Sequence, residues 1–147
     1  MVKIDLMNSD FISGLPMNIP GSVLLAEDDD DDLFLSKRVL AKAGIAPVFH
    51  VADGKEAMDY LAGQGVYADR VRHPLPEVML LDLKMPFFSG HEVLEWVRTR
   101  PELGGLKVYV LTSSGEMSDR ERAEKAGAQG YFVKPLTPAH LAVMRGS

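Results

Sequence analysis

The sequence predicts an α/β protein with an open, doubly wound parallel sheet of five strands and helices on both faces. Three observations support this fold class: short apolar runs recur along the chain, each run is continuous, and stretches long enough for a helix separate them. Continuous apolar runs are typical of parallel strands buried on both faces, whereas half-exposed strands alternate apolar and polar residues. The expected strands are 23–26, 48–51, 78–81, 108–111 and 131–133.

Helix signals lie between these runs. Gly44 and Gly127 each follow a Lys-Ala pair and are expected to end helices in the left-handed conformation, which glycine adopts readily. Asp53 is expected to be a helix N-cap, and Ser118 to open a capping box. Thr137 precedes a proline and is expected to cap a short final helix.

The length of 147 residues suits a single domain. Residues 1–21 show no sustained hydrophobic period and contain several glycines and prolines, so we expect them to form an N-terminal arm outside the fold. The regular pattern begins at Ser22, and the domain is expected to span residues 22–147.

The composition excludes several classes of function. The chain has no cysteine, which rules out disulfides, thiolate metal sites and thiol nucleophiles. No apolar stretch approaches the roughly 18 residues that span a membrane, and the first residues lack the features of a secretory signal. We therefore expect a cytoplasmic protein that does not contact the membrane.

The negative charge is concentrated in one segment. The chain has 16 Lys and Arg against 21 Asp and Glu, a net charge of −5. Six consecutive acids occupy residues 27–32, and the remaining 15 acids and 16 bases leave a net charge of +1. A nearly neutral domain with one acidic run is not expected to bind nucleic acid.

Residues with reactive or charged side chains follow four of the five expected strands. Glu27 and Asp28 follow the first strand, Asp82 the third, Thr112 the fourth and Lys134 the fifth. In open α/β sheets, ligands bind beyond the carboxyl ends of the strands. With a strand order of 2-1-3-4-5, the ends of the first and third strands are neighbours, so three carboxylates would converge.

Such a cluster needs a cation or a proton, because carboxylates about 4 Å apart repel by roughly 4 kcal/mol at an effective dielectric constant near 20. A donor set made only of oxygen atoms favours Mg²⁺, with Mn²⁺ as the alternative, over zinc. A calcium-binding loop is excluded because Leu33 occupies the position that requires glycine. We interpret residues 29–32 as solvated acids that favour the positive end of the following helix.

These residue types suit phosphoryl transfer. An aspartate can act as a nucleophile and form an acyl phosphate, while a metal ion neutralises charge on the transferring group. A lysine supplies a point charge for one phosphoryl oxygen, and a threonine supplies a hydroxyl for another.

Four segments resemble the receiver domain of two-component response regulators, and the resemblance covers about residues 23–144. The segments are VLLAEDD, LLDLKMPFFSG, VLTSS and GYFVKPL. The resemblance implies a flavodoxin-like fold. It also implies a bacterial signalling domain that is phosphorylated in a phosphorelay, rather than an enzyme with a separate substrate.

The resemblance also implies roles for single residues. Asp82 is the expected phosphoacceptor, Asp28 a direct Mg²⁺ ligand and Glu27 a second acid that acts through water. Lys84 stands where the family binds the metal through a backbone carbonyl, and Thr112 is the expected switch hydroxyl.

Three further expectations concern the segment after the fourth helix. The resemblance implies that Lys134 contacts the phosphoryl group and that the Lys134–Pro135 peptide bond is cis. Tyr131 is the expected aromatic side chain that packs inward after phosphorylation.

The four histidines show no ligand spacing and are interpreted as incidental.

The expected partner is a sensor histidine kinase or a phosphotransfer protein. Residues 62–76 form a longer segment than in the simplest receivers and resemble single-domain regulators that partner bacterial phytochrome-type histidine kinases. The short final helix puts the usual dimer face in doubt, so a homodimer stays open.

Two other functions are weighed against this one. An aspartate-nucleophile phosphatase normally has an acid two residues after its nucleophile, where this chain has Lys84. An interaction module that is never phosphorylated normally lacks some of the acids or the lysine, and all of them are present here.

Overall fold

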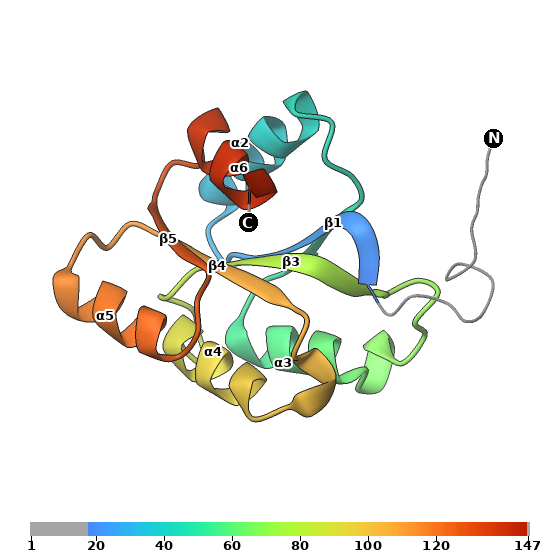
Figure 1. Ribbon diagram of the computed structural model, residues 1–147. Coiled ribbons are helices and arrows are strands. Elements are labelled where there is room, and N and C mark those ends of the chain that lie inside the picture. The colour runs from blue at the N-terminus through green and yellow to red at the C-terminus, as the bar shows by residue number, and fades with distance from the viewer. Residues whose placement is uncertain (1–17, 147) are drawn as a thin grey trace.

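The computed structural model describes residues 18–146, which form a five-stranded sheet with two helical layers (Figure 1). All strand pairs are parallel and the order is β2-β1-β3-β4-β5, which confirms the predicted fold class. The strands are β1 (Asn18–Ala26), β2 (Val48–Val51), β3 (Leu75–Leu81), β4 (Lys107–Thr112) and β5 (Gly130–Val133).

Helices cover both faces of the sheet. Helices α2 and α6 lie on one face, and α3, α4 and α5 lie on the other (Figure 1). Their bounds are α2 (Asp30–Lys42), α3 (Gly54–Ala62), α4 (Gly90–Arg98), α5 (Met117–Lys125) and α6 (Pro138–Gly146). Two short 3₁₀ helices, η1 (Gly65–Tyr67) and η2 (Pro101–Leu103), precede β3 and β4. Within residues 18–146, no helix is both long and apolar enough to cross a membrane.

The core consists of two apolar layers, one on each side of the sheet. Successive residues of β1 contribute to opposite layers: Leu24 and Ala26 pack in one, Val23 and Leu25 in the other. All four side chains are almost fully buried. The strand therefore has no polar face, which explains why its sequence is a continuous apolar run.

The N-terminal boundary lies earlier than the sequence analysis places it. Strand β1 begins at Asn18, and its first residues pair with the start of β3, so residues 18–21 belong to the sheet. The register then shifts before Val23, and Gly21 has a φ of 80° at this irregularity. A Pro-Gly pair normally marks a turn, and here it marks a bulge within a strand. The rest of the expected arm, residues 1–17, lies outside the described residues.

Most of the predicted helix ends are confirmed. Gly44 and Gly127 have φ values of 74° and 92°, and Asp53 accepts a hydrogen bond from the backbone of α3. The Thr137 hydroxyl accepts a hydrogen bond from the backbone N–H of His140 in the first turn of α6. The Lys134–Pro135 peptide bond is cis, as expected.

The predicted cap at Ser118 is wrong. Helix α5 begins at Met117, and its N-cap residue, Glu116, makes no side-chain cap bond. The Ser114 hydroxyl instead accepts a hydrogen bond from the Glu116 N–H at 3.3 Å, which shapes the turn before the helix. Ser118 therefore lies inside the first turn of α5 rather than before it.

The long segment between α3 and β3 is folded against the end of α3. The Arg70 guanidinium donates hydrogen bonds to the carbonyl oxygens of Tyr60, Leu61 and His73 at 2.7 to 2.9 Å. The Tyr60 hydroxyl donates to the carbonyl of Pro74 at 2.9 Å. Arg70 thus satisfies carbonyls that the helix end leaves without an intrahelical partner.

We expect Gly90→Ala to lower the free energy of unfolding by about 1–3 kcal/mol, because the added methyl group would enter a packed backbone. A Cβ atom at Gly90 would lie 2.2 Å from the carbonyl oxygen of Asp82 and 2.7 Å from the Cα atom of Leu83. The matched control is Gly105→Ala, where a Cβ atom would meet nothing within 4 Å. Urea unfolding measures both, and equal stabilities for the two variants would contradict the expectation.

Candidate functional site

The carboxyl ends of four strands bring the predicted site residues together. Glu27 directly follows β1 and Asp82 directly follows β3, and the Asp82 N–H donates to the carbonyl of Ala26 at 3.1 Å. Thr112 ends β4, and Lys134 follows β5 with its N–H bonded to the carbonyl of Thr112 at 2.8 Å. Backbone pairing between neighbouring strands therefore positions every one of these residues.

Lys134 lies at the centre of the site. Its Nζ atom is 2.8 Å from a carboxylate oxygen of Glu27, of Asp32 and of Asp82. An ammonium group has three N–H donors, so each donor faces one carboxylate. The side chain of Lys134 is only 11% exposed, and those of Glu27 and Asp82 are 1% and 6% exposed. The ion pairs with Glu27 and Asp82 are thus largely shielded from water, whereas the side chain of Asp32 is 36% exposed.

Three carboxylates of the site also fit a divalent cation. One oxygen atom each from Glu27, Asp28 and Asp82 lies within 4.8 Å of the other two. Two of these groups are buried, and Asp28 is exposed on the solvent side. A cluster of oxygen donors with one open side is the donor set that Mg²⁺ and Mn²⁺ prefer.

The electrostatic environment of the buried groups follows from their packing. Burial raises the pKa of Glu27 to about 7, a hydrogen bond from Lys134 acts against this, and the charge of Asp82 adds to it. Burial by itself would lower the pKa of Lys134, but hydrogen bonds to Asp32, Asp82 and Glu27 raise it above its usual value. The lysine therefore stays protonated, and its charge holds together acids that would otherwise repel.

Several backbone groups hold the acids in place. The Asp29 N–H donates to the Glu27 carboxylate at 3.2 Å, and the Lys84 N–H donates to Asp82 Oδ1 at 3.3 Å. The carbonyl of Glu27 lies 2.8 Å from Nε2 of His50 on β2. These contacts orient the first acid and the expected phosphoacceptor before any ligand binds.

Tyr131 points inward in this structure. Its ring is 7% exposed, and its hydroxyl donates to the carbonyl of Ser114 at 2.8 Å. The guanidinium of Arg120 lies over the ring at 5.0 Å from its centroid. Thr112 is fully buried, and the Ser114 N–H faces its Oγ1 atom at 3.4 Å. The loop from β4 to α5 thus connects Thr112 with Tyr131.

The sequence analysis does not identify Asp32 as a site residue. Asp32 lies in the first turn of α2 and contacts Lys134, whereas we had interpreted it as one of several solvated acids. The Asp29 cap and the acidic first turn of α2 agree with that interpretation. Only the contact between the first turn of α2 and the segment that follows β5 distinguishes Asp32 from its neighbours, and no pattern within the run signals this.

His91 has a specific role in packing, although the sequence pattern indicates none. The side chain is 8% exposed, and Nε2 lies 3.0 Å from Oδ1 of Asp119. The carboxylate of Asp119 accepts a hydrogen bond from Ser114 and another from His91, and these two bonds lower the pKa of Asp119. Nδ1 of His91 is buried without a hydrogen-bond partner in residues 18–146, which costs about 1–3 kcal/mol.

The comparison with protein families identifies the class. The model of the response regulator receiver domain matches residues 23–144, which is most of the chain. The chain therefore belongs to the receiver-domain family of two-component signalling, and the resemblance seen in the sequence is confirmed. Curated relatives include the probable methanogenesis regulatory protein FilR2 of Methanothrix harundinacea. It is 34% identical over 122 residues, which cover 80% of this chain and 74% of that protein.

Solved structures agree and point to one group within the family. The bacteriophytochrome response regulator AtBRR is 37% identical, with a TM-score of 0.76, covering 84% of this chain and 89% of its own. The phosphorylated cyanobacterial phytochrome response regulator RcpA is 31% identical, with a TM-score of 0.73 and coverages of 85% and 89%. The Mn²⁺-bound form of response regulator Rcp1 is 32% identical, with a TM-score of 0.72 and coverages of 85% and 88%.

We expect Lys134→Met to lower the free energy of unfolding by about 3 kcal/mol in the presence of EDTA, because it leaves buried carboxylates without their counter-charge. The control is Lys55→Met, which removes a lysine whose ion pair with Asp59 lies at the surface and whose side chain is 63% exposed. Surface pairs contribute little, so this variant should unfold like the wild type. If Lys134→Met is as stable as the control, Lys134 does not hold the acids together.

Proposed function

We propose that the chain is a response regulator that accepts a phosphoryl group on Asp82 from a histidine kinase and then changes its binding to other proteins. One observation carries this proposal: Asp82 is a buried carboxylate that shares Lys134 with two other acids, and it also belongs to an oxygen cluster of the size a cation needs. An acid at the surface, or one in a purely structural ion pair, would not require both the contact with Lys134 and a place in the oxygen cluster.

The residues at the site have separate tasks in this transfer. An oxygen of Asp82 attacks the phosphorus atom of a phosphohistidine; the new P–O bond forms as the P–N bond breaks, and the electron pair of that bond stays on the histidine nitrogen. Lys134 then donates to a phosphoryl oxygen in place of Asp82. Glu27, Asp28, Asp82 and the backbone carbonyl of Lys84 would hold a divalent cation, which would neutralise charge on the transferring group.

The conformational response uses the loop after β4. The hydroxyl of Thr112 becomes a donor to the phosphoryl group, and the loop moves with it. Tyr131 already packs inward with its hydroxyl on the carbonyl of Ser114. The phosphoryl group therefore favours an arrangement that the protein can adopt without it, as in a shift between existing states.

The partners follow from the family and its solved members. AtBRR, RcpA and RtBRR are phytochrome response regulators by name, which supports a phytochrome-type histidine kinase as the donor. A phosphotransfer protein fits the same chemistry. We assign the output to protein binding, with a homodimer as one form of it, and not to an enzymatic activity. The receiver domain in this proposal includes the strand residues from Asn18 onward.

Incubation with acetyl phosphate and Mg²⁺ should add one phosphoryl group to the protein, visible by mass spectrometry of the intact chain. Asp82→Asn should abolish the addition, because the amide is not a nucleophile for this step. Asp59→Asn, which alters a half-buried acid on α3 outside the site, should be modified like the wild type. A wild-type chain that gains no phosphoryl group, or an Asp82→Asn chain that gains one equally, would refute the proposal in favour of an unphosphorylated interaction module.

The Asp28→Asn variant should bind Mg²⁺ at least about tenfold more weakly than the wild type, because it replaces a charged oxygen ligand with a neutral one. The control is Asp31→Asn, which removes the same charge from an exposed acid in the first turn of α2. Calorimetric titration of each protein with MgCl₂ measures the difference. Equal weakening by both variants would mean that Asp28 acts only through its general negative charge.

A further inference from the structure

A second polar network lies beside the phosphoacceptor site and uses none of its acids. Ser114 Oγ donates to Asp119 Oδ2 at 2.6 Å, and Asp119 Oδ1 lies 3.0 Å from Nε2 of His91. Because the carboxylate only accepts, His91 donates through Nε2. The network joins the β4–α5 loop, the first turn of α5 and the first turn of α4.

One end of this network reaches the residues that respond to phosphorylation. Ser114 contacts two of them at once: its N–H faces Thr112 Oγ1 at 3.4 Å, and its carbonyl accepts from the Tyr131 hydroxyl at 2.8 Å. Any shift of Ser114 therefore changes the environment of both side chains. The Ser114 hydroxyl donates to Asp119 and accepts from the N–H of Glu116 at 3.3 Å, and the shorter of these two contacts, to Asp119, joins Ser114 to the first turn of α5.

The other end of the network, His91, lies next to a residue that packs against the backbone of Asp82. His91 directly follows Gly90, which packs so closely against the backbone of Asp82 and Leu83 that a Cβ atom there would lie 2.2 Å from the Asp82 carbonyl oxygen. Gly90 also donates its N–H to the carbonyl of Leu83 at 2.9 Å. The first turn of α4 therefore has a fixed position relative to Asp82. Through its contact with Asp119, His91 fixes the position of Asp119 relative to this turn.

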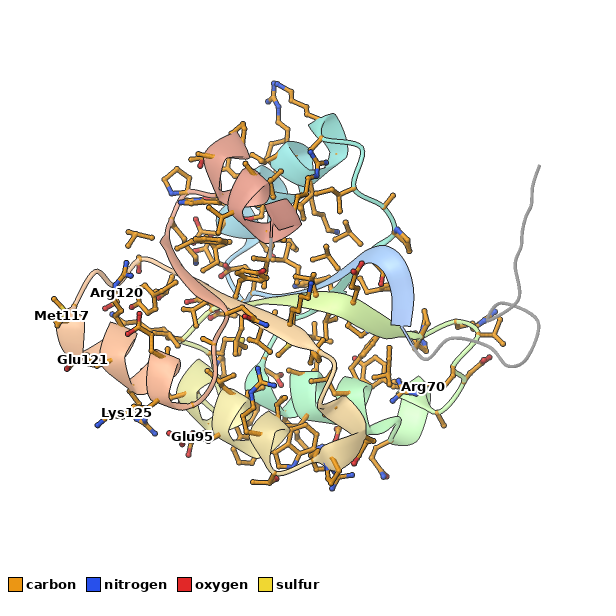
Figure 2. All side chains as sticks on the ribbon, in the orientation of Figure 1. Arg70, Glu95, Met117, Arg120, Glu121 and Lys125 are labelled. Carbon is orange, nitrogen blue, oxygen red and sulfur yellow. The ribbon has the colours of Figure 1, made fainter. Side chains whose placement is uncertain are left out.

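Helix docking by itself does not account for His91. Helices α4 and α5 are also joined by an exposed ion pair, in which Arg122 Nε lies 3.0 Å from a carboxylate oxygen of Glu95. Figure 2 shows Glu95 at the outer side of this helix pair. A leucine at position 91 would fill the buried space without leaving Nδ1 unpaired. A polar residue at this buried position is explained by its contact with Asp119.

We propose that His91 is a positioning residue that acts through Asp119 to hold Ser114, and with it the inward position of Tyr131 and the loop that carries Thr112. This inference rests on the proposed function, because the positioned loop is the one that responds to a phosphoryl group on Asp82. Breaking the network lowers the population of the inward arrangement. It thereby slows phosphorylation, since less of the protein is in the reactive state.

The test uses full-length protein labelled with 3-fluorotyrosine and observed by ¹⁹F NMR without a phosphoryl donor. The Tyr131→Phe variant assigns the resonance of Tyr131 among the four tyrosines. In His91→Leu, the Tyr131 resonance should move towards that of a solvent-exposed tyrosine. The rate of phosphorylation by acetyl phosphate at saturating Mg²⁺ should fall by about three- to tenfold, the effect of losing one hydrogen bond.

Three further variants separate positioning from stability. His91→Gln keeps an N–H donor for Asp119 and should restore both readouts towards the wild type. Glu95→Gln weakens the exposed contact between the same two helices and should change neither readout. Asp119→Ala removes the acceptor of both hydrogen bonds and should shift both readouts in the same direction as His91→Leu, so it carries the test if His91→Leu does not fold.

The outcomes distinguish this inference from the proposed function. An unchanged Tyr131 resonance in both His91→Leu and Asp119→Ala would overturn the positioning role, whatever the phosphorylation rates. A His91→Gln protein as defective as His91→Leu would also overturn the positioning role, because it would show that position 91 requires a particular side-chain shape and not an N–H donor. If the wild type is never phosphorylated, the proposed function fails, while the ¹⁹F spectra still decide whether His91 positions Tyr131.

Discussion

The contact between Lys134 and three carboxylates is the interaction on which the rest of this site depends. Glu27 and Asp82 are almost completely buried, and two charges at about 4 Å repel by roughly 4 kcal/mol even at an effective dielectric constant near 20. One ammonium group with an acceptor for each of its three donors offsets this repulsion. It does not neutralise the cluster, because Asp28 adds a further negative charge beside it. The site is therefore held in shape while keeping an excess of negative charge that attracts a cation.

This arrangement is a consequence of the sheet rather than of the loops. Asp82 bonds to the backbone of β1, and Lys134 bonds to the last residue of β4, so each functional residue is fixed by the strand next to its own. The strands in turn are buried on both faces by two apolar layers. Because those layers exclude water from the strand ends, Glu27 and Asp82 are buried, and burial raises the pKa of Glu27. Apolar packing of the sheet therefore sets the electrostatic environment of the acids at its edge.

The parts of the fold and site that could be predicted from the sequence are those set by local pattern. Continuous apolar runs locate the strands, and the residue after each run locates Glu27, Asp82 and Lys134 at one edge. Asp32 could not be identified in this way, because its contact with Lys134 joins the first turn of α2 to the segment after β5, and its neighbours in the run are also acids. His91 was missed for the same reason: its partner Asp119 lies on another helix, 28 residues away in the chain.

Thr112 lies where the two polar networks meet. Its carbonyl accepts the N–H of Lys134, and its hydroxyl faces the N–H of Ser114. The first network contains Asp82, whose charge the proposed phosphorylation would change, whereas the second contains no residue proposed to be modified. The proposed response requires both features. Without the contacts of the second network, the β4–α5 loop would have no defined position relative to α4 and α5. Without the change of charge at Asp82, nothing would shift the loop. In the proposed response β4 links the two networks, because it lies between β3, which leads to Asp82, and β5, which carries Tyr131.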